Sequence, residues 1–104
     1  MNKYRAKRTW SNLVNRWFDS RAECVRGEEL HLLERAGEIT DLQYQVKFVL
    51  CDRPKEKVSI TIDFAYKIAG MPIYNDYKGM ETREFRVKRI WLKEKQGIDI
   101  LLTS

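Results

Sequence analysis

The sequence predicts a single α/β domain in which one mixed sheet is flanked by helices, with the elements in the order α-β-β-β-α-β. Two segments with helical spacing and capping residues enclose three extended segments, and a fourth extended segment follows the second helix. The length of 104 residues fits one domain, and a composition of 43% hydrophobic and 34% charged residues is typical of a folded globular chain.

The first helix is expected over residues 20–36. Ser20 followed three positions later by Glu23 forms a capping box, which satisfies free N–H groups in the first turn. Gly37 suits the C-terminal end of the helix. The side chains expected to face the core share one side of the helix. They are Ala22, Val25, Leu32, Leu33 and Ala36.

Three strands are expected next, at 42–50, 58–66 and 73–78. Large apolar residues alternate with small or polar ones in the second of them, which gives that strand two distinct faces. Turn residues separate the strands at 52–56 and 69–72. The second and third strands are therefore expected to form a hairpin.

A second helix is expected over 81–95, and a last strand over 98–102. The helix ends at Gln96-Gly97, where glycine permits the chain to leave the helical conformation. Its core-facing side chains are expected to be Phe85 and Leu92, with Val87 and Trp91 beside them.

The excess of positive charge is confined to the front of the chain. The net charge is +5; residues 1–26 hold seven basic and two acidic residues, and the remaining 13 basic and 13 acidic residues balance. Residues 1–17 are expected to form a basic, irregular arm ahead of a domain over 18–104. Such an arm is attracted to a polyanion through phosphate contacts and counterion release. A merely solubilising tail is the alternative interpretation.

The two cysteines, Cys24 and Cys51, follow no metal-ligand spacing. Because no signal peptide is recognised, both are expected to be reduced thiols in a cytoplasmic protein. No apolar run approaches the roughly 20 residues that span a bilayer, so no membrane partner is expected.

The expected hairpin over 57–78 carries the residues that predict chemistry. Asp76 and Lys78 are two positions apart in a strand and share a face, and Asp63 approaches Asp76 if the two strands pair. Two carboxylates and one ammonium group then converge at the edge of the sheet. The alternative is a surface set of cross-strand charges, because D-x-K alone is a weak signal.

This set of side chains suits the hydrolysis of a phosphodiester. Carboxylates hold Mg²⁺, or Mn²⁺ in its place, because these ions prefer hard oxygen ligands. The metal generates hydroxide and neutralises charge on the phosphate. Lys78 would orient or deprotonate the attacking water, or stabilise charge beside the scissile phosphate.

Four motifs occur in a set order, and the order is more specific than any one of them. They are Phe18-Asp19-Ser20-Arg21-Ala22-Glu23; Ala36-Gly37-Glu38-Ile39 followed by Gln45-Val46-Lys47-Phe48; Ile62-Asp63-Phe64; and Asp76-Tyr77-Lys78-Gly79. This set resembles an uncharacterised family of small phage proteins in the PD-(D/E)xK, or restriction-endonuclease-like, nuclease superfamily. The arrangement is also similar to the phage junction-resolving endonuclease I and to a transposon end-cleaving nuclease with an S-x-x-E helix. The resemblance covers most of residues 18–102.

The resemblance implies a metal-dependent DNA endonuclease with a restriction-endonuclease-like core. Its substrate would be branched DNA, such as a Holliday junction, or double-stranded DNA processed by a phage or mobile element. The implied catalytic residues are Glu23, Asp63, Asp76 and Lys78. The implied ligands of Mg²⁺ or Mn²⁺ are Glu23, Asp63, Asp76 and Tyr77.

Three further residues are candidates for the site. Glu29 lies near the centre of the first helix's apolar stripe and competes with Glu23 for the role of helix ligand, while Glu23 also has its capping role. Gln45 occupies a place where related nucleases often carry a glutamine; a solvent-facing strand residue is the alternative. Lys88 lies within the apolar stripe of the second helix and would reach toward the active-site edge.

Two groups of basic residues are expected to contact DNA phosphates, one in the arm and one opposite the apolar side of the second helix. They are Lys3, Arg5, Lys7 and Arg8 in the arm, and Arg83, Arg86, Arg89 and Lys93 on the helix. A non-catalytic DNA-binding recombination accessory protein on the same fold is the alternative function. If the chain is phage-encoded, its expected location is the cytoplasm of a bacterial host.

A homodimer is also expected. One chain offers one active site, and two cuts at symmetric positions are most simply made by two copies. The front segment, with Tyr4, Trp10 and Trp17, is expected to pack against the partner, because aromatic residues are favoured at interfaces. A monomeric nickase whose tryptophans cover its own core is the alternative.

Overall fold

The predicted α-β-β-β-α-β order is confirmed in the computed structural model, which describes residues 7–78 and 80–104. Lys3, Tyr4, Arg5 and Gly79 therefore lie outside the described residues. A short pair of strands precedes the core. The core elements are α1 (Arg21–Arg35), β3 (Thr40–Arg53), β4 (Glu56–Ile68), β5 (Met71–Tyr77), α2 (Arg83–Gln96) and β6 (Ile100–Thr103).

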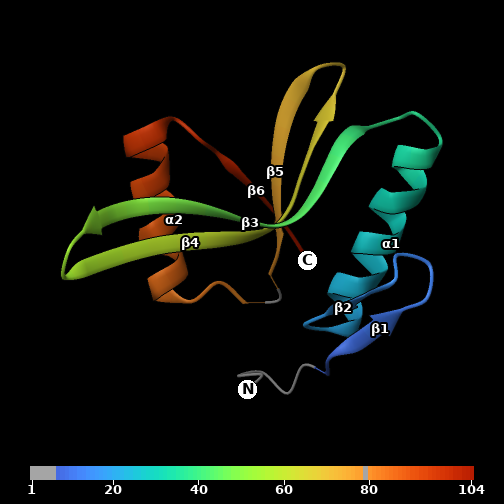
Figure 1. Cartoon of the computed structure of the whole chain (residues 1–104), viewed down its shortest axis with the longest axis horizontal. Helices are drawn as coiled ribbons and strands as arrows, with labels where there is room; N and C mark the ends of the chain where they lie inside the picture. Colours follow the sequence, from blue (N-terminus) through green and yellow to red (C-terminus); the bar gives the residue numbers. More distant parts are fainter. Residues whose placement is uncertain (1–6, 79) are drawn as a thin grey trace.

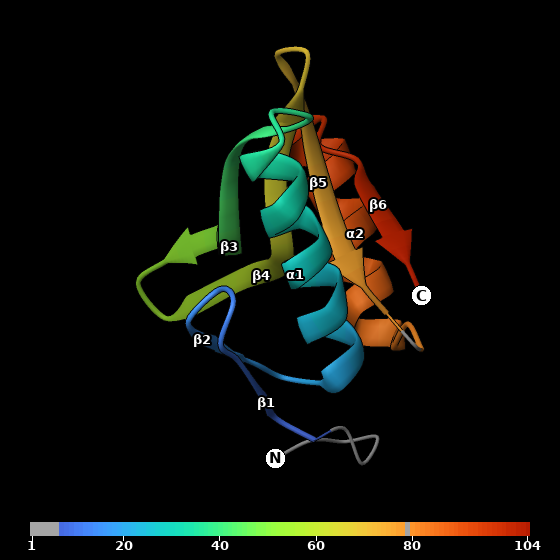
Figure 2. The same cartoon turned by 90° about the vertical axis from the view of Figure 1, so that its right-hand side faces the viewer.

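The main sheet has the strand order β3-β4-β5-β6 and is mixed. β3, β4 and β5 are successive antiparallel neighbours, whereas β6 pairs with β5 in parallel. A parallel pair needs a long crossover connection, and α2 provides it. Figures 1 and 2 show α1 and α2 on opposite sides of the sheet, as the predicted fold class requires.

The turn between β4 and β5 is a tight hairpin of two residues. Ala69 and Gly70 both have positive φ, 51° and 80°, and they connect the paired residues Ile68 and Met71. Two successive left-handed residues match the right-handed twist of the flanking strands. The turn therefore fixes the register of β4 against β5, which decides which residues face each other in the site.

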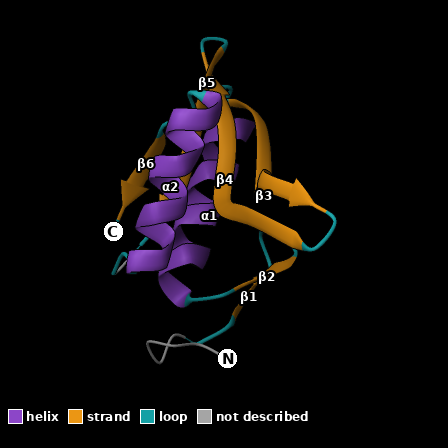
Figure 3. Ribbon diagram, turned by 90° about the vertical axis from the view of Figure 1, so that its left-hand side faces the viewer, coloured by secondary structure: helices purple, strands orange, loops and turns teal. Residues whose placement is uncertain are grey.

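The core is divided between the two sides of the sheet, because β4 changes its packing partner along its length. Ile60 and Ile62 pack with Leu92 of α2, whereas Phe64 and Tyr66 pack on the α1 side. A regular strand would direct these four alternate residues to one face. Figure 3 shows the sharp bend in β4 that separates the two halves.

The buried face of α1 differs from the predicted stripe. Val25 and Leu32 are 58% and 52% exposed, and the residues that face the sheet include Gly27 and Leu30. A Cβ added at Gly27 would lie 2.5 Å from the Phe18 ring. The helix therefore packs closely against Phe18 at this glycine. A search for apolar side chains at helical spacing does not detect a helix face that packs through glycine.

The segment before α1 is a β-hairpin in its described part, and the expectation of an irregular arm is wrong there. β1 (Thr9–Ser11) pairs antiparallel with β2 (Arg16–Phe18). The turn between them includes Asn15, with φ of 63°, whose N–H bonds the carbonyl of Ser11 at 2.8 Å. Strands of three residues are too short to give a readable alternation.

The expectation for α2 is confirmed in part. Thr82 caps the helix by accepting a hydrogen bond from the Phe85 N–H at 3.1 Å, and Gly97 ends it with φ of 69°. Leu92 is buried and Phe85 packs against the same cluster. Trp91, expected in the core, is instead 38% exposed.

Candidate active site

The bend in β4 brings Asp63 and Asp76 into direct contact. The pairing of β4 with β5 ends at Phe64 and Asn75, so Asp63 lies just beyond the last residue pair of these two strands. This N–H donates to Oδ1 of Asp76 at 2.8 Å. The N–H of Tyr77 donates in turn to Oδ2 of Asp63 at 2.9 Å. Backbone groups thus fix both carboxylates.

Asp76 is buried, and its two carboxylate oxygens have different partners. Its exposed fraction is 1%, and Oδ1 accepts from the N–H of Asp63, whereas Oδ2 accepts from no backbone N–H of the described residues. The counter-charge is the Nζ of Lys78, 3.1 Å from Oδ2. The same ammonium lies 4.2 Å from the ring centre of Phe85, so α2 helps to hold Lys78 in place.

Glu23 reaches the site from the first turn of α1. Its N–H donates to Oγ of Ser20 at 3.0 Å, and its Oε2 accepts from the N–H of Asp19 at 2.9 Å, which confirms the predicted capping role. The side chain is buried. Its carboxyl group lies close enough to Asp63 to act on the pKa of that residue. Capping and membership of the carboxylate group therefore coexist.

The acidic side chains are held in a site with too little positive charge. Burial, and then the neighbouring Glu23 carboxyl, raise the pKa of Asp63 to about 8. Burial, and then the charge of Asp63, raise the pKa of Asp76 to about 6, although Lys78 opposes the increase. Both shifts mean that the ionised pair is destabilised until more positive charge arrives.

Gln45 lies beside Asp63 on the neighbouring strand. It has φ of 52° within β3, between the paired residues Tyr44 and Val46. Its Nε2 is 3.5 Å from Oδ1 of Asp63. The side chain is exposed, so both interpretations hold in part: it faces solvent and it borders the site.

Glu29 does not join the carboxylates. It is exposed and pairs with Arg26, so the expectation that it lies in a buried stripe is wrong. The helix rotates this position away from the sheet because its close contact runs through Gly27. Glu23 is the α1 carboxylate that meets Asp63.

Lys88 approaches the other side of the site. It lines a cavity of about 300 Å³ together with Lys78, Thr61 and Thr82. Its ammonium pairs with Glu84 at 3.1 Å. The expectation that Lys88 reaches toward the active-site edge is consistent with this position.

Asn75 has a positioning role that the sequence did not indicate. It is fully buried, and its Nδ2 donates to the carbonyl of Leu101 at 2.9 Å and to Oγ1 of Thr103 at 3.1 Å. Its Oδ1 accepts from Nε of Arg26 at 3.1 Å. This amide joins α1, β5 and β6 beside Asp76. The signal available in the sequence was an amide side chain directly before Asp76 in the same strand.

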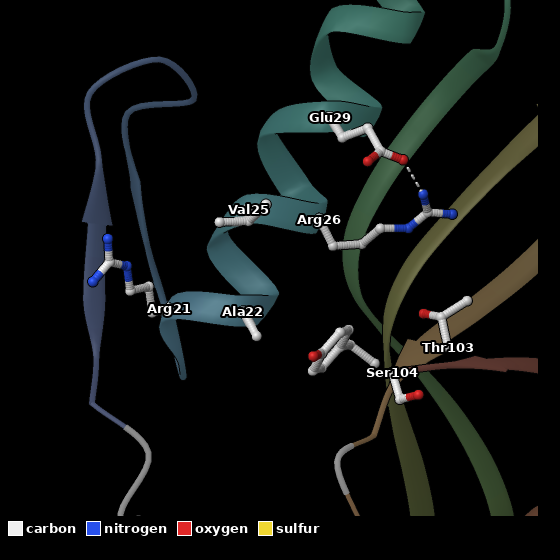
Figure 4. Close-up of a pocket in the computed structure, with 8 residues that line it drawn as sticks. Arg21, Ala22, Val25, Arg26, Glu29, Thr103 and Ser104 are labelled. Atoms are coloured by element: carbon white, nitrogen blue, oxygen red, sulfur yellow. Dashed lines mark hydrogen bonds and ion pairs between the residues drawn. The ribbon is translucent and has the colours of Figure 1, made fainter.

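A groove of about 670 Å³ lies between α1 and the ends of β5 and β6, and Glu29 is the acidic residue that lines it (Figure 4). One wall is α1, with Arg21 and Arg26, and the opposite side is formed by Tyr77 and Thr103. Tyr77 also donates its N–H to Asp63, so the groove adjoins the site.

The donor set suits a hard divalent cation, although its ligands are not yet gathered around one point. Among the described residues, no three His, Cys, Asp or Glu side chains are arranged to hold a metal as they stand. Asp63 is nevertheless a neighbour of both Glu23 and Asp76, because, in addition to burial, Glu23 raises the pKa of Asp63 and Asp63 raises the pKa of Asp76. Carboxylate oxygens are the ligands that Mg²⁺ and Mn²⁺ prefer.

The residues expected to contact DNA divide into free and paired groups. Lys7, Arg8, Arg83 and Arg86 are exposed. Arg89 donates to both carboxylate oxygens of Glu81, at 2.8 and 3.2 Å, and Lys93 pairs with Asp99 at 3.0 Å. The paired charges have less to offer a phosphate, because each is already partly neutralised.

Cys24 and Cys51 are free thiols, as expected. Neither helix in the described part of the chain has the length and apolar character that a membrane span requires.

Comparison with known proteins gives one match. The model of a family described as "Protein of unknown function (DUF1064)" matches residues 1–102. No curated protein and no solved structure matches the chain.

Proposed function

We propose that this chain, which belongs to the DUF1064 family of proteins of unknown function, is a metal-dependent endonuclease that hydrolyses DNA phosphodiester bonds. One observation carries the proposal: Asp76 is buried against the Asp63 backbone, beside the Asp63 carboxylate, with the ammonium of Lys78 3.1 Å from its Oδ2 as counter-charge. A buried carboxylate without sufficient partners is costly unless a cation or a reaction uses it.

The proposed metal is Mg²⁺ or Mn²⁺. Asp63, Asp76 and Glu23 would hold it through carboxylate oxygens, and Tyr77 stays a proposed ligand from the resemblance. When bound, the ion supplies Lewis-acid chemistry, which activates water and neutralises charge on the phosphate. The raised pKa values of Asp63 and Asp76 fit this role, because a divalent charge would favour their ionised forms.

Lys78 is the proposed catalytic cation. Its ammonium stays with Asp76 and lies over the Phe85 ring, so it is directed at the carboxylate pair. There it would orient the attacking water or stabilise charge that develops on the phosphate. Gln45, at the exposed side of Asp63, would donate to water or to a phosphate oxygen.

The proposed enzyme is of the PD-(D/E)xK type and acts on branched or double-stranded DNA. The α-β-β-β-α-β order and the positions of Asp63, Asp76 and Lys78 support this proposal. Two cuts in a duplex or junction favour two copies of the chain, so we also propose a homodimer.

The decisive experiment is cleavage of supercoiled plasmid and of a four-way DNA junction by purified protein. Nicked or linear product is expected with Mg²⁺ or Mn²⁺ and none with EDTA. The variant Asp76→Asn, purified identically, must be inactive, because this control separates the activity from a contaminating nuclease.

DNA binding with no cleavage in either metal would overturn the nuclease proposal. It would leave the chain as a non-catalytic DNA-binding accessory protein. Cleavage that persists in Asp76→Asn at the wild-type rate would also overturn the assignment of the site.

A further inference from the structure

The β1–β2 hairpin presents an aromatic surface that the fold itself does not need. Trp10 and Trp17 are paired across the strands and are 41% and 51% exposed, and Leu13 in the turn is 40% exposed. The two indole rings meet edge to face, with their centres 5.5 Å apart. Figure 1 shows the hairpin at the edge of the molecule, next to α1.

The opposite face of the hairpin anchors it to the domain. Ser11 is buried, and its hydroxyl donates to Oε2 of Glu28 at 2.7 Å. Phe18 belongs to the core on the α1 side. The guanidinium of Arg16 lies 4.5 Å from the ring centre of Tyr44. The two tryptophans are thus held on a fixed scaffold, and their exposure is not a consequence of a loose segment.

The segment of sequence that carries these tryptophans is basic. Residues 1–18 contain five basic residues and no acidic one. Arg8 lies 5.1 Å from the ring centre of Trp17, and Lys7 is exposed beside it. Aromatic faces interleaved with cations are the combination that binds single-stranded nucleic acid, because bases stack on the rings and phosphates meet the cations.

We infer that the face formed by Trp10, Leu13 and Trp17 binds an unpaired stretch of DNA by stacking its bases. Unpaired bases fit this face better than duplex DNA does, because a base within a duplex is already stacked and offers only its edge. The inference rests on the proposed function in taking DNA as the substrate. It adds that the preferred substrate has single-stranded or unpaired nucleotides near the cut.

A second copy of this chain is the less suitable occupant. A two-fold interface would place the same face against itself. The basic residues of one copy would then meet those of the other, with no acidic residue in residues 1–18 to compensate. We therefore expect a homodimer to use a face other than the front segment with Trp10 and Trp17, which the sequence alone favoured.

The test measures binding in EDTA, so that cleavage plays no part. Fluorescence anisotropy of a labelled oligothymidylate is compared with that of a duplex of equal length. For the double variant Trp10→Ala/Trp17→Ala, the affinity for the single strand is expected to fall at least about tenfold, since one base–aromatic stack is worth roughly 1–3 kcal/mol. The affinity for the duplex is expected to change much less.

Two further variants make the test specific. Trp91→Ala removes an exposed tryptophan from α2 and is expected to leave both affinities unchanged. Trp10→Phe/Trp17→Phe keeps aromatic faces and is expected to retain most of the single-strand affinity. If the phenylalanine variant retains single-strand affinity and the alanine variant loses it, the loss is due to stacking and not to a folding defect.

Three results would overturn the inference. They are unchanged single-strand affinity in the alanine variant, an equal loss for duplex and single strand, and conversion of a wild-type dimer to a monomer by the alanine substitutions. The last result, read from light scattering, would assign the face to a second copy. Plasmid cleavage is assayed separately, so its absence with intact single-strand binding would sink only the proposed nuclease function.

Discussion

The N–H of Asp63 donates to Oδ1 of Asp76 at 2.8 Å, so the position of one carboxylate depends on the backbone of the other. Tyr77 completes the link, because its N–H donates to Oδ2 of Asp63 at 2.9 Å. These bonds use one oxygen of each aspartate. In Asp76 the oxygen outside this pair of bonds is the buried Oδ2, which faces the ammonium of Lys78 at 3.1 Å.

The substitution Asp76→Asn is expected to abolish metal-dependent cleavage while leaving DNA binding intact or tighter. Asparagine retains an oxygen for the Asp63 N–H but removes the charge that would hold the metal and repel phosphate. Isothermal titration with Mn²⁺ should show weaker binding, and plasmid nicking should be lost. Asp99→Asn is the matched control, because Asp99 forms an exposed pair with Lys93. Metal binding in Asp76→Asn equal to that of wild type would contradict the assignment.

The metal-free protein is expected to lose stability as pH rises from about 4 to about 8. The pKa values of Asp63 and Asp76 are raised to about 8 and about 6 in the folded state, from an ordinary value of 3.8. Over this interval the folded state binds more protons than the unfolded state, so the free energy of unfolding falls with pH. Asp76 alone is expected to lower the free energy of unfolding by on the order of 3 kcal/mol over this interval, at about 1.4 kcal/mol for each unit of pKa.

Urea unfolding in EDTA at a series of pH values measures this dependence. Asp76→Asn should flatten the curve, and Mg²⁺ should restore stability mainly at the alkaline end, where the carboxylates are ionised. A flat curve for the wild-type protein would show that the two carboxyl groups are not perturbed.

The substitution Lys78→Met is expected to reduce the single-turnover rate by roughly 10²–10⁴, the usual loss for one acid–base or charge-stabilising group. Methionine keeps an apolar stem over Phe85 but leaves the buried Asp76 without its counter-charge, so thermal unfolding is measured beside the rate to confirm that the variant is folded. Lys67→Ala, which removes a surface pair with Asp41, is the control. An unchanged rate in Lys78→Met would remove this residue from the mechanism.

Local sequence rules predicted much of the fold. The capping box of Ser20 and Glu23 marks the start of α1, and Gly97 marks the end of α2, because these residues satisfy backbone groups that no distant contact can satisfy. The buried face of α1 depended instead on tertiary packing. Val25 and Leu32 have the right character for a core, but the close contact is made at Gly27.

In the candidate site, too, local sequence rules predicted some residues, whereas others depend on tertiary packing. The two-residue period of a strand placed Asp76 with Lys78, and the hairpin brought Asp63 to them. The choice of Glu23 over Glu29 came from the resemblance, because it depends on how α1 lies over the sheet. Asn75 was missed for a related reason, since its partners are on α1 and β6.

The substitution Gly27→Ala is expected to destabilise the protein by about 1–3 kcal/mol, although alanine is the better helix former. The added Cβ would lie 2.5 Å from the Phe18 ring and 3.3 Å from the Phe64 ring, so α1 or both rings must move. Thermal unfolding measures the effect. Gly37→Ala is a contrasting variant, because a Cβ there meets no atom within 4 Å and only its φ of 81° is unfavourable. A higher melting temperature for Gly27→Ala would show that α1 is not packed this closely.

Deletion of residues 2–8 is expected to weaken the salt dependence of DNA binding without unfolding the domain. It removes Lys3, Arg5, Lys7 and Arg8 and ends before the hairpin strand at Thr9. If all four contact phosphates, the slope of log affinity against log salt should fall by about 3–4 units, because each contact releases close to one counterion. Lys93→Ala is the control with little expected change, since that ammonium is paired with Asp99 at 3.0 Å. An unchanged slope after the deletion would mean that the front of the chain does not lie on the DNA backbone.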